Sequence, residues 1–292
     1  MLIRSLLAIF LLIGSSLSFA GARHYVLENT EYLELHSKQT GRDYELIIQF
    51  PSSYKNSPGK RYPVLYFADG YWDTPLLSAT YGNFMYDNVA PEFIMVGLSY
   101  PGRNVNYDRL RRYDLTPTEV STENNPTGGA AKFLAFIKQD VVPLMEKKYR
   151  ADPKQRVLSG VSLGGLFTLY AMYQDPEYFG RYVALSPAIH WDKNYIVSVD
   201  NQYASAHREL NARLFLSYGT GEYAPYREPI ADFQQQLQKR NYQGLALKNY
   251  QMEGLRHVSE KGEGYAHGLI WVFKDIAPTG PSGLEKGLRG IK

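Results

Sequence analysis

Residues 156–170 read RVLSGVSLGGLFTLY, in which Ser162 stands between glycines where two apolar segments meet. The first segment, residues 156–161, is typical of a buried strand, and residues 163–170 continue as an apolar helix. The pentapeptide GVSLG, residues 160–164, therefore matches the Gly-x-Ser-x-Gly nucleophile elbow, a sharp turn from strand to helix. Side chains two residues before and after the serine would collide in such a turn, so glycine is required there. The stretch predicts an exposed, nucleophilic serine.

On both sides of this stretch, strand-like apolar runs alternate with helical segments. YPVLYFADG (residues 62–70) and FIMVGLSYP (residues 93–101) are continuous apolar runs, as expected of strands buried on both faces. RYVALSP, ARLFLSYG and LALKNYQM read as later strands. Residues 31–51 read as two strands joined by a turn at Gly41 and Arg42. The alternation predicts an α/β fold with a mostly parallel central sheet and helices on both faces.

The remaining segments indicate one domain over residues 23–277, because no internal linker divides the chain. Residues 102–128 are polar and read as a long loop or small subdomain, of a length that is often functional. Residues 188–210 read as irregular or partly helical. The Gly- and Pro-rich residues 278–292 predict a flexible C-terminal tail.

A serine elbow needs a base, and the order expected in this fold is serine, then acid, then histidine. Four of the six histidines come too early for this order: His24, His36, His190 and His207. His257 follows the strand LALKNYQM in a polar loop, whereas His267 lies within the final apolar helix. His257 is therefore the predicted base.

The acid is expected directly after the strand ARLFLSYG, in the loop TGEYAPYRE. Glu222 is the nearest carboxylate, and Glu228 and Asp232 lie farther along, in the helix that follows. A carboxylate here would orient the imidazole of the base and stabilise its protonated form. The helix after Ser162 points its first amides toward the developing oxyanion, which makes the Leu163 amide a predicted donor.

Composition excludes several other classes of site. The chain has 292 residues and a net charge of +3 without basic blocks, so nothing indicates nucleic-acid binding. It has no cysteine, which excludes disulfides, a thiolate nucleophile and a Cys-based metal site. No His-rich ligand cluster appears, and we expect neither a metal nor another cofactor. The 25 tyrosines suit a Tyr-rich surface and sheet, or a groove that stacks an aromatic ligand.

The first residues, MLIRSLLAIFLLIGSSLSFAGAR, have the layout of a secretory signal. Arg4 supplies the positive region, a short apolar run follows, and Ala20 and Ala22 have the spacing of a cleavage site. We therefore expect residues 1–22 to be a cleaved signal peptide, against the alternative of an uncleaved anchor. Export without disulfides fits the periplasm of a Gram-negative bacterium or secretion, with no stable membrane insertion after cleavage.

Long blocks of the chain, from about residue 40 to 275, resemble the putative-esterase family of α/β-hydrolases. YPVLYFADG, RRYDLTPT and FLSYGTGEY resemble successive family blocks, and the block around Ser162 is long and specific. The family includes the esterase D group and periplasmic siderophore esterases. The resemblance implies a serine esterase that takes a small-molecule ester, such as a siderophore or another aromatic ester.

The resemblance also implies roles for single residues. Ser162 is similar to the family nucleophile and His257, in HVS, to its histidine. The corner that includes Gly70 and Tyr71 resembles a second oxyanion element, formed by a backbone amide. Arg112 resembles a basic residue near the mouth of the site in the siderophore-esterase group.

The chain also departs from the family pattern. The family often has paired tryptophans after the Ser-Pro dipeptide, and Trp191 is the one that remains here. Some members use serine and histidine with little help from an acid, so the resemblance assigns Ser162 and His257 but does not itself assign Glu222. Two alternative functions stay open: an acyltransferase of the mycolyltransferase-like type, and a non-catalytic binding module on the same fold. Oligomeric state stays open too.

Overall fold

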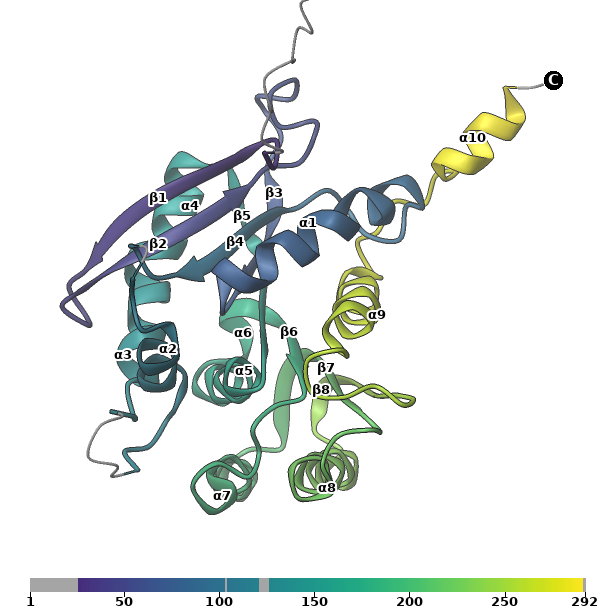
Figure 1. The fold of residues 1–292 in the computed structure, drawn as a ribbon. Helices are drawn as coiled ribbons and strands as arrows, with labels where there is room; N and C mark the ends of the chain where they lie inside the picture. The colour runs from purple at the N-terminus through teal and green to yellow at the C-terminus, as the bar shows by residue number, and fades with distance from the viewer. Residues whose placement is uncertain (1–25, 103, 121–125, 291–292) are drawn as a thin grey trace, which may run out of the picture.

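The computed structural model describes residues 26–102, 104–120 and 126–290 (Figure 1). The predicted signal peptide, residues 1–22, lies outside the described residues. No helix in the described ranges is both long enough and apolar enough to cross a membrane.

A single sheet forms the centre of the molecule, with strand order β1-β2-β4-β3-β5-β6-β7-β8. β1 and β2 are antiparallel to each other, and β2 is antiparallel to β4. From β4 to β8 every neighbouring pair is parallel, which confirms the prediction of a mostly parallel sheet. The strands are β1 (Thr30–Ser37), β2 (Arg42–Gln49), β3 (Tyr62–Phe67), β4 (Ile94–Ser99), β5 (Ala151–Val161), β6 (Gly180–Leu185), β7 (Glu209–Gly219) and β8 (Gln243–Met252).

Helices cover both faces of the sheet, as predicted (Figure 1). They are α1 (Gly70–Tyr86), α2 (Tyr107–Leu115), α3 (Ala130–Phe136), α4 (Val142–Lys148), α5 (Leu163–Gln174), α6 (Pro176–Phe179), α7 (Trp191–Ala206), α8 (Ala224–Arg240), α9 (Lys261–Phe273) and α10 (Gly283–Arg289). Alternate residues of β3 point to opposite faces, because side chains alternate along a strand. Leu65 and Phe67 pack in the cluster that includes α1 and α9, and Val64 and Tyr66 pack in the cluster that includes α5.

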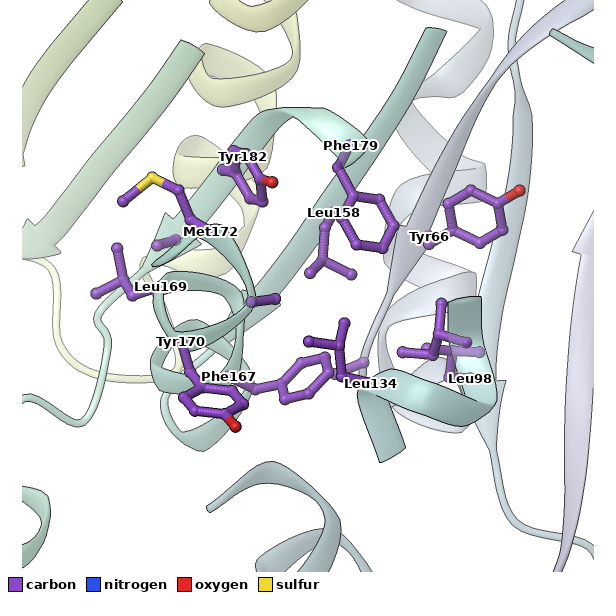
Figure 2. Packing of buried hydrophobic residues seen from close by; sticks show 14 of the residues in the cluster. Tyr66, Leu98, Leu134, Leu158, Phe167, Leu169, Tyr170, Met172, Phe179 and Tyr182 are labelled. Atoms are coloured by element: carbon purple, nitrogen blue, oxygen red, sulfur yellow. The ribbon is translucent and has the colours of Figure 1, made fainter. Parts of the chain in front are cut away.

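The cluster that contains Tyr66 buries α5 almost completely. Figure 2 shows Phe167, Leu169 and Met172 of this helix among the buried side chains of the cluster, which include Leu158 and Tyr182. The helix that follows Ser162 is therefore fixed by packing on every side. The N-terminus of α5 therefore has a defined position at the carboxyl end of strand β5, and this position determines where the turn at Ser162 lies.

Three segments contain helical structure that the sequence analysis did not specify. Residues 102–128 include a regular helix, α2, which no sequence pattern had singled out. A π-helical turn, Ile137–Val141, joins α3 to α4 just before Pro143, so the chain continues helically past the proline. The predicted flexible tail contains α10, whose first turn has a capping box in which Ser282 and Glu285 bond to each other's backbone.

Candidate active site

Ser162 stands in the turn between β5 and α5, in a backbone conformation that residues with side chains rarely adopt. Its φ is 61° and its ψ is −118°, and such strain persists only where surrounding contacts hold it. The glycines are needed for space, because a Cβ atom on Gly160 would overlap the backbone of Gly164. A Cβ atom on Gly165 would lie 2.9 Å from the carbonyl oxygen of Leu185 in β6. Local sequence and close packing together produce the predicted elbow geometry.

Glu222, the predicted acid, is buried in the turn after β7 and accepts three hydrogen bonds. Its Oε2 lies 2.9 Å from Nδ1 of His257. Its Oε1 accepts from the Ser186 hydroxyl at 2.5 Å and from the Gly219 amide at 2.9 Å. Burial raises the pKa of Glu222, but the hydrogen bonds from His257, Ser186 and Gly219 outweigh it and leave this pKa below its ordinary value. Glu222 is therefore a charged partner for the imidazole, whereas Glu228 and Asp232 are exposed.

His257, the predicted base, reaches Glu222 from the loop between β8 and α9. Because Nδ1 faces the carboxylate, Nε2 is the nitrogen left to exchange a proton with a substrate or nucleophile. In the described part of the chain no hydrogen bond joins Ser162 to His257; the Ser162 Oγ lies 3.4 Å from the Tyr226 hydroxyl. Such a bond is often long before substrate binds. Both residues line one cleft, so the structure brings them together.

Two other histidines have different surroundings. His267 lies on α9, where its Nε2 is 3.1 Å from the exposed hydroxyl of Tyr250, and it does not line the cleft with Ser162. His190 precedes α7, and its ring centre lies 4.7 Å from that of Tyr226. Burial and the nearby charge of His257 lower the pKa of His190, so His190 is a neutral neighbour of the site near pH 7.

The predicted oxyanion donors all lie in the first turns of two helices. Leu163 is the first residue of α5, and Gly70 and Tyr71 are the first two residues of α1. The two helix starts lie close together, since a Cβ atom on Gly164 would lie 3.1 Å from the Cβ of Ala68. Asp69, just before α1, has a left-handed φ of 57°. Free amides at helix N-termini favour negative charge, which suits this corner to an oxyanion.

A cleft of about 270 Å³ opens over Ser162. Its wall includes two aromatic side chains, Tyr71 and Trp72. The ring of Tyr71 stacks on Tyr107 of α2 at 4.1 Å between centres, and Trp72 is half-exposed. The full lining is Asp69, Tyr71, Trp72, Asp108, Arg111, Val161, Ser162, His257, Val258 and Lys261.

Both basic side chains in this lining are paired with carboxylates. Arg111 donates to both oxygens of Asp69, at 2.7 and 2.8 Å. Lys261 donates to Asp73 at 2.6 Å, and its Nζ lies 4.0 Å from the ring centre of Trp72. These pairs leave the cleft without a strong positive field, and they fix two of its walls in place.

The two residues predicted to bind substrate lie elsewhere. Arg112 follows Arg111 on α2 but does not line the cleft; its nearest carboxylate is that of Asp108, at 3.6 Å. The indole nitrogen of Trp191 donates to the hydroxyl of Thr118 at 3.0 Å, so Trp191 holds residues of the predicted loop against α7. Neither side chain is among those that surround Ser162.

Sequence reasoning missed Arg111 and Tyr226. Asp108 and Arg111 are three residues apart in DRLR, residues 108–111, and share a helix face, but that signal requires the helix to be recognised first. Tyr226 lies in the first turn of α8, and no sequence pattern sets it apart from the other tyrosines. No group of three potential metal ligands occurs among the described residues.

Two known siderophore esterases are similar to this chain in sequence. Ferri-bacillibactin esterase BesA of Bacillus subtilis is 26% identical over 258 residues, which are 80% of this chain and 86% of that protein. The siderophore enterobactin esterase of Emericella nidulans is 28% identical over 208 residues, which are 64% of this chain and 68% of that protein.

A solved structure is similar to this chain in fold and in sequence. The BES protein from Bacillus cereus has a TM-score of 0.79 and 26% identity, with 87% of this chain and 98% of that chain covered. These similarities confirm the α/β-hydrolase fold, and the named relatives are ester hydrolases. The family model described as "Putative esterase" matches residues 37–270, and the chain therefore belongs to this esterase family.

Proposed function

We propose that this chain is a serine esterase that hydrolyses a carboxylic ester through an acyl-enzyme formed on Ser162. The observation that carries the proposal is the joint placement of the strained Ser162 and the Glu222–His257 pair at one cleft. Glu222 and His257 come from separate loops, and serine, acid and histidine follow one another along the chain in the order expected for this fold.

In the proposed mechanism His257 acts as base and then as acid. Nε2 takes the proton of Ser162 as Oγ bonds to the ester carbonyl carbon, and the carbonyl oxygen becomes the oxyanion. The amides of Leu163 and of Gly70 or Tyr71 stabilise that charge. Collapse of the intermediate breaks the bond to the alcohol, which leaves with the proton from His257. Water then repeats the sequence on the acyl-enzyme, with Oγ as the leaving group.

We propose that the substrate is an ester whose acyl part carries an aromatic ring, such as an ester-linked catecholate siderophore. Tyr71, whose ring stacks on Tyr107, and the half-exposed Trp72 line the cleft and offer aromatic surface to a planar acyl group. The names of the relatives support a siderophore-type ester. The signal-like residues 1–22 support export, so the substrate would be met in the periplasm or outside the cell.

The test is a hydrolysis panel with wild type and S162A. The panel contains aryl esters of rising acyl length, starting from the acetate, together with hydroxycinnamate esters and a catecholate siderophore with and without iron. Wild type should favour the aromatic esters, and S162A should lose about 10³-fold or more in kcat. A preference for short aliphatic acyl groups would contradict the substrate class.

A fluorophosphonate probe tests the mechanism separately. It should label wild type and S205A, a control at an exposed serine of α7, and should not label S162A. Normal turnover by S162A would contradict the whole mechanism. An unlabelled, inactive wild-type protein would instead favour a binding module.

A further inference from the structure

Tyr226, on α8, contacts the nucleophile and its surroundings through both its hydroxyl and its ring. The hydroxyl donates to the carbonyl oxygen of Ser186 at 2.8 Å and lies 3.4 Å from Oγ of Ser162. The ring packs edge-to-face on His257, with 4.5 Å between ring centres and 70° between ring planes. On another side its ring lies 4.7 Å from that of His190. One side chain thus touches the nucleophilic oxygen and the proposed base.

The hydroxyl has one proton and two acceptors within reach. The shorter contact, to Ser186, takes that proton while Ser162 is a neutral alcohol. Negative charge on Oγ would make it the stronger acceptor, because hydrogen bonds to charged groups are stronger than neutral ones. Burial raises the pKa of Tyr226 above its ordinary value, so the phenol keeps its proton at neutral pH and remains a donor.

We propose that Tyr226 is a further catalytic residue, whose hydroxyl donates a hydrogen bond to Ser162 Oγ as that oxygen gains negative charge. The proposal rests on the esterase mechanism above and adds to it a donor beside the nucleophile. The anchor at Ser186 holds the hydroxyl near Oγ before the reaction, so little reorganisation is needed.

Tyr226 transfers no proton in this scheme. In acylation the Ser162 proton goes to His257 Nε2 while the Oγ–carbon bond forms, and Tyr226 stabilises the partial charge on Oγ. In deacylation the same bond breaks, Oγ leaves with its electron pair, and His257 returns the proton. The tyrosine hydroxyl bonds Oγ in both transition states and turns back to Ser186 afterwards.

A purely structural role would act through Ser186. Tyr226 holds the Ser186 carbonyl, and the Ser186 hydroxyl donates to Glu222. Loss of the tyrosine hydroxyl would then weaken the Glu222–His257 pair and move the acid limb of the pH–rate profile. A direct bond to Oγ lowers the rate without moving that limb, and this difference separates the two roles.

The experiment compares Y226F with Y223F. Tyr223 lies three residues earlier and is 78% exposed, so Y223F removes a tyrosine hydroxyl outside the site. Y226F keeps the ring that packs on His257. We expect Y226F to lower kcat and kcat/KM together by roughly 10- to 100-fold, the range of one hydrogen bond to a charged group. KM and the acid limb should stay unchanged, as should every property of Y223F.

Two results would overturn the proposal. Equal turnover of Y226F and Y223F would remove the role of the hydroxyl. A loss in Y226F that comes with a shifted acid limb, matched by S186A, would assign Tyr226 to positioning of Glu222 instead. S162A is measured alongside: activity that survives S162A contradicts the esterase mechanism itself, whereas inactive S162A with normal Y226F contradicts the Tyr226 proposal alone.

A second measurement covers the case in which Y226F folds poorly. Site-specific incorporation of 3,5-difluorotyrosine at position 226 keeps the shape of the side chain but makes the phenol more acidic. In the pH range where phenolate absorbance appears, the donor is lost and kcat should fall while wild type stays active. Full activity of the ionised enzyme would overturn the proposal.

Discussion

Oε2 of Glu222 lies 2.9 Å from Nδ1 of His257, although 35 residues separate the two. They come together because β7 and β8 are neighbouring parallel strands, so the loops after them begin at the same edge of the sheet. The other oxygen of Glu222 is held by Ser186, which follows β6. The loops after three neighbouring strands, β6, β7 and β8, thus supply the hydrogen-bonded group of Ser186, Glu222 and His257 beside Ser162.

We predict that His257, and not His267, is required for turnover. H257A should lower kcat about 10³-fold or more, because the base and the nucleophile act as a unit. H267A removes the contact of an exposed histidine with the hydroxyl of Tyr250 and should leave kcat nearly unchanged. Steady-state kinetics of the two variants on one aryl ester checks this, and the reverse pattern would assign the base to His267.

We predict that E222Q lowers kcat less than S162A does. The glutamine keeps the size of the side chain but removes the negative charge that favours a protonated imidazole. The acid limb of the kcat/KM profile should therefore move to lower pH. E228Q, an exposed carboxylate on the next helix, is the matched control. An unmoved limb in E222Q would show that the carboxylate does not act on the base.

We predict different outcomes at two neighbouring arginines. Arg111 lines the cleft and binds both oxygens of Asp69, the residue just before the proposed oxyanion amides of Gly70 and Tyr71. R111A should lower kcat/KM by about 10-fold or more, the scale of a bidentate charged pair that positions a donor. R112A should have a small effect. A larger loss in R112A would support the role that the family resemblance implied for Arg112.

We predict that the buried carboxyl group of Glu260 makes stability depend on pH. Neither of its oxygens has a hydrogen-bond partner within the described residues. Burial, and then the charge of Glu222, raise its pKa from 4.5 to about 9. The folded state therefore holds a proton that the unfolded chain releases. This contribution to stability is complete below pH 4.5 and is lost progressively as the pH rises toward 9.

E260Q tests this prediction, because glutamine is neutral at every pH. Within that window, wild type should lose up to about 1.4 kcal/mol of unfolding free energy per pH unit relative to E260Q. The Tm difference between E260Q and wild type should therefore be larger at pH 8 than at pH 5. E253Q, at an exposed site, should follow wild type. A Tm difference that does not change with pH would contradict the raised pKa.

The elbow was predictable from sequence because its causes are local. A turn as sharp as the one at Ser162 requires glycine within two residues on either side, and a strand and a helix must flank it. Strand order along the chain then indicated the loops that contain Glu222 and His257. Continuous apolar runs such as residues 62–67 indicated a parallel sheet. A strand that is buried on both faces has apolar side chains on both, so its sequence does not alternate between apolar and polar residues.

What the tertiary structure decided depends on contacts between distant segments. Arg111 faces the cleft and Arg112 does not, because neighbouring residues on a helix point about 100° apart, and the rotation of α2 is set by its packing. Tyr226 meets Ser162 across 64 residues, through the placement of α8 beside the end of β6. Sequence patterns report periodicity and turns. They do not report which side chains of separate elements meet, because that follows from the packing of the whole core.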